Sequence, residues 1–414
     1  MRILIMGAGL AGVTTAFELL EDGHDVTVID RQPGPALETS FANAGLVAPG
    51  HAFAWASPKA PKILLGSLFK KDQPLRYRLR LDPAMWRWSL LFLRECTAEK
   101  ARINTQRKHR LCRYAQLALQ DVVSRTGIDF DGERKGLLYL YRKQESFDLG
   151  VQAMQIFMDA GQDLEVIDRD RAALIDPALE PAKAHIQGAI FGRSDESGDA
   201  RKFTEGLAAH CQELGVRFRY GTTITGIATE GDRIDEVQTD KGAIKADLYV
   251  MALGAYSPII ARSLKEAVSV YPVKGYSATL PVNGANNPPS VGGIDEDNLF
   301  AYARMGDRVR LTAVAEFAGY DTSHRPSDFS SMLTAAKELL PNAGDYAKPS
   351  YWACLRPMTP EGTPILGQGR HDNLYYCTGH GHMGWTMACG TARITADLIA
   401  GRKPDLPMDG LTLR

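Results

Sequence analysis

Three glycines stand close together near the start of the chain, in the run Gly7-Ala8-Gly9-Leu10-Ala11-Gly12. An apolar run, 3–6, precedes them, a segment with helical spacing follows at 13–20, and Asp30 ends the next apolar run. Glycines at this spacing permit a tight turn, a close approach to a pyrophosphate and close packing of helix on strand. The helix N-terminus offers unpaired N–H groups to phosphates, and the acid accepts hydrogen bonds from a ribose. The pattern predicts a dinucleotide site formed by Gly7, Ala8, Gly9, Leu10, Ala11, Gly12 and Asp30.

Two later segments have the character of further cofactor contacts. Residues 249–255 read as a buried strand that ends in glycine, and 378–386 read as a glycine-rich turn between a strand and a helix. A helix beginning at this turn would point its N-terminus at the edge of a flavin ring and stabilise negative charge at N1 and C2=O after reduction. Contacts this far from an N-terminal glycine loop favour FAD over NAD. The predicted contacts here are Ala252, Gly254, Gly379, Gly381, Met383, Gly384, Trp385 and Thr386.

The elements between these segments indicate a second sheet of a different kind. Alternating apolar residues at 268–280, 298–304 and 308–315 are typical of antiparallel strands. Residues 51–82 are rich in Pro, Lys and Arg and show no long periodic element. The other predicted helices are 85–93, 111–123, 145–160, 202–214 and 383–400, and the other predicted strands are 136–141, 216–219, 222–229, 233–239, 248–252 and 374–377. The order of these elements indicates the α/β class.

The composition excludes several classes of protein. The chain has 414 residues, a net charge of −1 and 44% hydrophobic residues, which excludes a disordered chain and disfavours a nucleic-acid binder that relies on overall charge. The six cysteines form no CxxC pair and no metal-binding spacing, so we expect reduced thiols and no metal. The first apolar run leaves no room for a signal peptide, and the uncharged stretch 373–392 is too rich in glycine for a membrane span. We expect a cytoplasmic protein, with peripheral contact at the inner face of the cell membrane as an alternative.

Six motifs, in order along nearly the whole chain, carry a family resemblance. They are VIDRQPG at 28–34, ETSFANAG at 38–45, DESGD at 195–199, YPVKGYS at 271–277, LRPMTPEGTP at 355–364, and TGHG followed by GWTMACG within 378–390. The chain resembles the FAD-dependent D-amino acid oxidase superfamily, which includes glycine oxidase, and within it the small subunits of bacterial D-amino acid dehydrogenases. The resemblance adds Arg31, Ser40, Asn43, Ala44, Gly45 and Ile224 to the expected FAD contacts.

The resemblance also implies a domain arrangement. It implies an FAD-binding Rossmann-like domain with an interleaved α+β substrate domain built on an antiparallel sheet. The implied FAD-binding segments are 1–60, 190–257 and 354–401, and the implied substrate-binding segments are 61–189 and 258–353.

A reaction follows from the same resemblance. FAD-dependent oxidative deamination would convert a D-amino acid into an imino acid, which hydrolyses to a 2-oxo acid and ammonia; the Cα hydrogen would leave as hydride to flavin N5. The electrons would pass to a quinone or a respiratory partner. Three alternatives stay open. One is oxidation of D-proline or 4-hydroxy-D-proline, whose secondary amines suit the same transfer; the others are a sarcosine-type oxidation of N-methyl amino acids and a non-catalytic FAD subunit of a larger dehydrogenase.

Arg356 is the first candidate for substrate binding. The planar guanidinium of arginine bonds a carboxylate with two parallel hydrogen bonds, and the resemblance matches Arg356 to the arginine that holds the substrate carboxylate in glycine oxidase. Tyr276 and Tyr271 are candidates for hydroxyl contacts or for core packing. Lys274 either faces the site or neutralises nearby carboxylates.

His380 and Cys354 are each open to two readings, and His382 departs from the pattern of the relatives. His380 either bonds the flavin or makes a structural hydrogen bond, and His382 stands where relatives have a small residue, so it shapes the pocket. The two histidines without a third ligand are weak evidence for a metal. Cys354 matches the cysteine that monomeric sarcosine oxidases link covalently to the flavin, or it is a small buried thiol.

Residues 59–94 form a basic, amphipathic segment. It contains nine basic and two acidic residues, a net charge of +7, interleaved with Trp86, Trp88, Leu90, Leu91 and Phe92. An anionic membrane surface or an acidic electron acceptor would fit this segment. The alternative is a solvated basic face whose long side chains cover a core helix.

Overall fold

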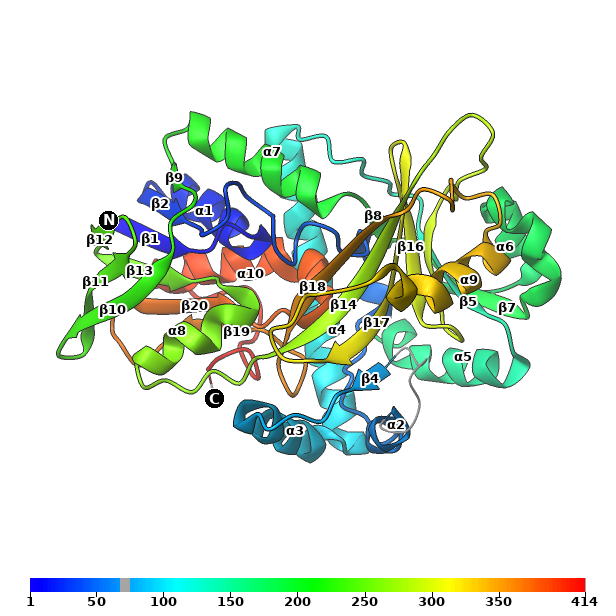
Figure 1. Ribbon diagram of the computed structural model, residues 1–414, viewed down its shortest axis with the longest axis horizontal. Helices are drawn as coiled ribbons and strands as arrows, with labels where there is room; N and C mark the ends of the chain where they lie inside the picture. Colours follow the sequence, from blue (N-terminus) through cyan, green and yellow to red (C-terminus); the bar gives the residue numbers. More distant parts are fainter. Residues whose placement is uncertain (68–74, 414) are drawn as a thin grey trace.

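The computed structural model describes residues 1–67 and 75–413, and it forms two units that lie side by side (Figure 1). One unit is built on a six-stranded sheet and the other on a nine-stranded sheet. Strands from the beginning, middle and end of the chain share the smaller sheet. The chain therefore passes between the units several times, which confirms the interleaved α/β fold predicted from the sequence.

The six-stranded sheet is parallel except at one edge. Its order is β19 (Ile365–Gln368), β20 (Leu374–Thr378), β13 (Leu248–Met251), β1 (Arg2–Met6), β2 (Asp25–Ile29) and β9 (Arg217–Arg219), with only β19 antiparallel. Ile3 and Ile5 pack into the core on one face, and Leu4 and Met6 into the core on the other. A parallel sheet covered on both faces needs apolar side chains at every position, which explains the continuous apolar run.

Helices cover one face of this sheet and a small antiparallel sheet covers the other. The helices that share the core of Ile3 and Ile5 are α1 (Leu10–Glu21), α4 (Ala98–Thr126), α7 (Ala200–Glu213) and α10 (Gly384–Ile399). The small sheet consists of β10 (Ile224–Glu230), β11 (Arg233–Thr239) and β12 (Gly242–Ile244). Its Ile234 and Val237 pack against Leu4 and Met6.

Helix α4 is much longer than the predicted helix at 111–123. The Thr97 side chain caps its N-terminus, and Gly127 ends it in the left-handed conformation. Before residue 111 its buried positions are polar, namely Asn104, Thr105, Lys108 and His109. The apolar periodicity therefore begins late, although the buried stripe runs along the whole helix.

The nine-stranded sheet is mostly antiparallel. Its order is β18 (Ser350–Met358), β14 (Tyr271–Pro281), β17 (Arg308–Phe317), β16 (Phe300–Met305), β15 (Gly292–Asp295), β5 (Leu137–Tyr141), β7 (Gly188–Gly192) and β6 (Leu164–Asp168), and β4 (Leu75–Tyr77) also pairs with β17. The pairs β15–β5 and β4–β17 are parallel. The expected antiparallel sheet is thus a mixed one.

The remaining elements lie outside the three larger sheets. They are α2 (Ala60–Ser67), α3 (Pro83–Glu95), α5 (Gln144–Met158), α6 (Arg169–Ile175), α8 (Ser257–Ser263), α9 (Ser330–Leu339), β3 (Leu46–Val47), β8 (Glu196–Ser197), and the 3₁₀ helices η1 (Pro49–His51), η2 (Pro177–His185), η3 (Gly254–Tyr256), η4 (Pro326–Phe329) and η5 (Gly381–Met383). Of the predicted basic segment, Lys70, Lys71 and Asp72 lie outside the described residues. Within 1–67 and 75–413, no helix is long and apolar enough to cross a membrane.

Two of the expected domain boundaries fall inside strands of the larger sheet. Residue 190 lies within β7 and residue 354 within β18, and both strands pair in the nine-stranded sheet. A strand cannot change sheets in the middle of a ladder. We therefore propose that the chain crosses between the domains after residue 192 and after residue 358.

Candidate active site

One large cavity of about 760 Å³ collects most of the predicted site residues. Its lining comes from the β1–α1 turn, the loop 38–48, the strands β14, β17 and β18, and the turn before α10. The predicted cofactor residues that line it are Gly7, Gly9, Leu10, Ala11, Asp30, Arg31, Ser40, Asn43, Ala44, Gly45, Ile224, Ala252, Gly254, Gly381, Met383, Gly384 and Trp385. Ala8, Gly12, Gly379 and Thr386 lie outside the lining. The cavity spans both sheets, so neither unit forms it alone.

The β1–α1 turn forms a tight backbone cradle. Gly7 has a φ of +111°, and its N–H donates to the Ile29 carbonyl at 2.8 Å. A Cβ at Gly12 would lie 1.9 Å from the Gly7 oxygen, so Gly12 serves the packing of α1 on the turn rather than the cavity wall. Gly9, which precedes α1, provides no side-chain cap, and the Leu10 N–H donates to the Ser40 hydroxyl at 3.1 Å. The next N–H groups of this first turn, those of Ala11 and Gly12, are left for phosphate oxygens.

Asp30 holds this cradle in place from the end of β2. Its carboxylate accepts the backbone N–H groups of Ala8 at 2.7 Å and Gln32 at 2.8 Å. Burial raises the pKa of Asp30, although these two N–H groups oppose the shift by stabilising the charged form. The acid therefore orients the glycine turn as well as lining the cavity, where a ribose would meet it.

The C-terminal glycine turn supplies a second set of donors. Helix α10 begins at Gly384 without a side-chain cap. The Trp385 indole N–H is buried and has no hydrogen-bond partner among the described residues. A buried unpaired donor on a cavity wall is costly unless a ligand accepts from it. Together with the cradle at Gly7 and Gly12, this orphaned donor fits a large dinucleotide such as FAD.

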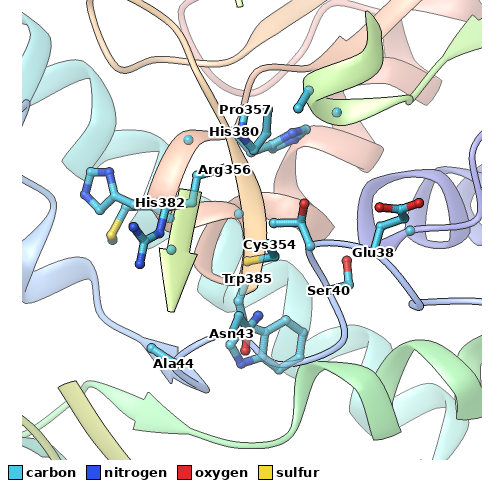
Figure 2. Close-up of a pocket in the computed structure, with 18 of the residues that line it drawn as sticks. Glu38, Ser40, Asn43, Ala44, Cys354, Arg356, Pro357, His380, His382 and Trp385 are labelled. Carbon is cyan, nitrogen blue, oxygen red and sulfur yellow. The ribbon is translucent and has the colours of Figure 1, made fainter. Parts of the chain in front are cut away.

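Arg356 reaches the cavity from β18. One of its terminal nitrogens, Nη1, donates to the Val314 carbonyl at 2.7 Å. The guanidinium lies over Gly275 of the neighbouring strand, where a Cβ would be 2.5 Å from Arg356 Cζ. Figure 2 shows Arg356 and His382 together on one side of the cavity and Glu38 and Ser40 on the other. Burial lowers the pKa of Arg356, but an arginine stays charged at neutral pH.

The three other predicted residues on β14, namely Tyr276, Lys274 and Tyr271, each have a hydrogen-bond partner within the protein. Tyr276 lines the cavity, but its hydroxyl donates to Glu316. Lys274 is buried outside the cavity lining, because its ammonium is bound by the Ser323 carbonyl and lies near the Glu316 carboxylate. The expectation that Lys274 neutralises nearby carboxylates fits this position, and a role in the cavity does not. Tyr271 also lies outside the lining and donates to Asp82 at 2.8 Å.

The two histidines of the glycine turn differ in their surroundings, but the pKa of each is lowered. His380 lines the cavity, and its Nε2 lies 2.9 Å from the Thr391 hydroxyl. Burial lowers the pKa of His380 to about 4, so the ring is neutral at physiological pH. This contact corresponds to the structural hydrogen bond, one of the two roles expected for His380 from the sequence. Burial lowers the pKa of His382, and the charge of Lys108 lowers it further. The ring of His382 stacks on Trp55, with the ring centroids 4.7 Å apart.

Cys354 lies on the same strand as Arg356 and lines the cavity (Figure 2). Burial raises the pKa of its thiol, and the charges of Arg356 and Arg310 only partly oppose this shift. The thiol is therefore the dominant form at neutral pH, and the thiol is a weak nucleophile.

Sequence reasoning missed four residues around the substrate end of the cavity. His51, Trp55 and Glu296 line it, and buried Lys108 contacts His382. Two of them, His51 and Trp55, lie in the stretch 51–82, which shows no long periodic element in the sequence. Large aromatic residues in such a stretch could have indicated a cavity wall. No sequence pattern indicated Glu296, because its partner His51 lies far away in the sequence.

One cavity joins a glycine cradle, the N-terminus of a helix and an arginine from a second sheet. This combination is typical of a two-domain oxidoreductase that uses a dinucleotide cofactor. A family model described as "FAD dependent oxidoreductase" matches residues 2–398. The chain belongs to this family, whose cofactor is FAD.

Relatives and solved structures agree with this assignment. D-amino acid dehydrogenase 2 of Mesorhizobium japonicum is 45% identical over 412 residues, covering 99% of both chains. D-amino acid dehydrogenase of Agrobacterium fabrum is 43% identical over 413 residues, covering 100% of this chain and 99% of the relative. Glycine oxidase from Geobacillus kaustophilus has the same fold, with a TM-score of 0.76 at 20% identity over 100% of this chain and 98% of that one. L-proline dehydrogenase from P. horikoshii gives a TM-score of 0.73 at 18% identity, covering 99% and 95%.

Proposed function

We propose that this protein oxidises D-amino acids to imino acids, which water converts to 2-oxo acids and ammonia. The observation that carries the proposal is the Arg356 guanidinium, fixed by the Val314 carbonyl in the same cavity as the dinucleotide cradle. A cation held there binds the carboxylate of an amino acid and turns its Cα toward a bound cofactor. The names of the two dehydrogenase relatives support the D-configuration and the dehydrogenase reaction.

Each part of the chain has a limited chemical task. Bound FAD would supply the two-electron oxidation, because flavin N5 accepts hydride from Cα of an amino acid with a neutral amine. Arg356 binds and orients the carboxylate. Neutral His380 holds the glycine turn through Thr391, so that the N-terminus of α10 faces the cavity. The apolar lining around them excludes water from the transfer.

We propose further that the electrons leave to a quinone or another respiratory acceptor near a membrane surface. The cavity extends to Ile63, Leu64, Leu75 and Phe92, in the segment 59–94. This segment exposes several large apolar side chains to solvent, namely Ile63, Leu65, Leu79, Leu81, Trp86, Leu90 and Leu93. Exposed basic residues stand between them, which suits an anionic bilayer.

Anaerobic reduction of the bound flavin tests the main proposal. The holoprotein is mixed with D-amino acids, with D-proline and with sarcosine, and the loss of flavin absorbance is followed; the L-enantiomers serve as matched controls. We expect bleaching by D-amino acids and little by L-amino acids. If no D-amino acid bleaches the flavin, the chain is a non-catalytic subunit; bleaching by sarcosine alone would favour the N-methyl alternative.

A further inference from the structure

An ion pair stands in the cavity wall without a role in the reaction described above. His51 Nε2 lies 2.7 Å from Glu296 Oε1, and both side chains line the cavity with partial exposure, 22% and 16%. His51 ends the short helix η1, and Glu296 follows β15 of the larger sheet. Removing two charges from water costs more than a single contact returns, so a buried pair needs a further reason.

Rigid neighbours fix the position of this pair. The His51 ring stacks on Tyr139 of β5 with the centroids 5.1 Å apart. Tyr139 donates to Asp195 at 2.5 Å, and the same carboxylate accepts the Gly50 N–H at 3.1 Å. The Glu296 N–H donates to the Leu140 carbonyl at 3.0 Å. Polar groups held this firmly by neighbouring strands are suited to recognise one substituent in one position.

The charges around the pair restrict what that substituent can be. Burial opposes protonation of His51, but the Glu296 carboxylate outweighs it and raises the pKa of His51, so the pair is neutral as a whole. Lys108 donates to the Phe53 carbonyl at 2.6 Å and lies 3.5 Å from His382 Nε2. His382 in turn lies beside Arg356 (Figure 2). Two further cations therefore stand near the wall of the cavity that the substrate enters.

Three kinds of side chain fit this arrangement less well than a hydroxyl does. An ammonium group would join Arg356, Lys108 and protonated His51 and meet net repulsion. A carboxylate would meet the Glu296 carboxylate directly, and this repulsion would offset its attraction to the three cations. An alkyl group would cover the pair without replacing the hydrogen bonds that water gives it. A hydroxyl carries no charge and can donate to the Glu296 carboxylate, which is a charge-assisted hydrogen bond.

We propose that Glu296, held by His51, binds a hydroxyl group on the side chain or ring of the substrate. Hydroxylated D-amino acids, open-chain or cyclic, are then the favoured substrate class. This inference rests on the proposed oxidation of D-amino acids and adds a specificity residue to it.

The test compares substrates that differ by one hydroxyl. The pairs are D-serine against D-alanine and 4-hydroxy-D-proline against D-proline, with D-lysine against D-norleucine as a test for a cationic side chain. The rate of anaerobic flavin reduction at several concentrations gives a dissociation constant and a limiting rate for each. The variants are Glu296→Leu, which removes the acceptor, and Glu296→Gln, which keeps an uncharged acceptor. Glu165→Leu is the matched control, because it removes an ion pair with Arg193 on the surface of the same sheet.

We expect wild type to prefer the hydroxylated member of at least one pair by about tenfold or more in reduction efficiency, the range of a hydrogen bond to a charged group. Glu296→Leu should bring this ratio close to one, Glu296→Gln should leave an intermediate ratio, and Glu165→Leu should keep the wild-type ratio. If Glu296→Leu does not fold, the ratio in Glu296→Gln decides, since a loss of charge must lower it.

Three results overturn the inference in distinguishable ways. If D-alanine and D-proline reduce the flavin but a hydroxyl gives no advantage, or the advantage survives in both Glu296 variants, the hydroxyl site is wrong and the proposed function stands. A preference for D-lysine that Glu296→Leu removes would replace it with a cation site. If none of these D-amino acids reduces the flavin, the proposed function fails and the hydroxyl site with it.

Discussion

Arg356 and Gly275 act as one unit across two strands. Val273 pairs with Arg356 and Gly275 with Cys354, so Gly275 lies next to the point where the arginine side chain crosses β14. The guanidinium occupies the volume that a side chain at 275 would take. One of its nitrogens is bound to Val314, which limits the rotation of the fork and leaves its other N–H groups to bind a carboxylate.

Replacement of Arg356 by lysine tests this geometry. The positive charge remains, but the bidentate fork and the contact with Val314 are lost. We expect KM for a D-amino acid to rise and kcat/KM to fall by about 10- to 100-fold, the worth of one charge-assisted hydrogen bond, with full flavin content. Arg193→Lys is the control for an exposed arginine, and an unchanged KM in R356K would contradict the assigned role.

The state of Cys354 is open to a direct test. Because burial keeps the thiol protonated, we expect the flavin to be held without a covalent bond. Acid denaturation of the purified protein should release the yellow colour into the supernatant. Colour that stays with the precipitated chain, and that Cys354→Ala removes, would show a covalent link.

At the scale of elements, the β1–α1 turn depends on the absence of one side chain. Gly12→Ala would place a Cβ 1.9 Å from the Gly7 oxygen and must displace α1 from the strand. We expect the FAD affinity of G12A to fall about tenfold or more, since overpacking costs about 1–3 kcal/mol. Gly284→Ala is the matched control, because a Cβ there meets nothing within 4 Å. Equal flavin content in both variants, measured by absorbance after dialysis, would argue against the cradle.

Helix α3 and the chain before it form the element that we propose to meet a membrane. Leu90 on α3 is 61% exposed, and an exposed leucine gains about 1.5–3 kcal/mol on burial. Leu90→Asp should therefore reduce co-sedimentation with phosphatidylglycerol vesicles by about tenfold at low salt. Leu174→Asp, at a 74% exposed position on α6, should bind as wild type does. An equal loss of vesicle binding in both variants, or no vesicle binding by wild type, would contradict the proposed membrane contact.

At the scale of the whole molecule, a buried acid links the two units. Asp195 accepts from Tyr139 of the larger sheet and from Gly50 of the loop that leads out of the cofactor segment. Burial raises the pKa of Asp195 from 3.8 to about 7, although these donors and the charge of His51 favour the anion. A folded pKa above the unfolded one gives stability that is complete below 3.8 and is lost as the pH rises through about 7.

Asp195→Asn tests this linkage. The neutral amide has no proton to lose, so the stability of D195N relative to wild type should rise between pH 4 and pH 7, by at most about 4 kcal/mol. Denaturant unfolding at a series of pH values measures the difference in unfolding free energy between D195N and wild type. The buried neutral histidines contribute equally to both proteins, so their opposite pH dependence cancels in this difference. A pH-independent difference would mean that Asp195 is ionised at all these pH values.

Features formed by residues close together in the sequence could be predicted, and features formed by contacts between distant segments could not. The glycine cradle could be predicted because Gly7, Gly12 and Asp30 act within one βαβ unit. Arg356 could be predicted only from its surrounding motif. The pair His51–Glu296 joins residues from separate segments, and neither residue has a neighbour pattern that indicates the other. Lys108 lies in a polar stripe of α4 that mimics a solvated face until the packing is known.

Because the two units are interleaved, some elements leave the ribosome long before the elements that pack against them. Helix α1, at the beginning of the chain, packs against α10, close to its end (Figure 1). During synthesis the apolar face of α1 and the edge of β1 therefore stay uncovered until residues 248–251 and 384–399 have emerged. The apolar surfaces of the nascent chain must be kept from aggregating until these segments have folded onto them.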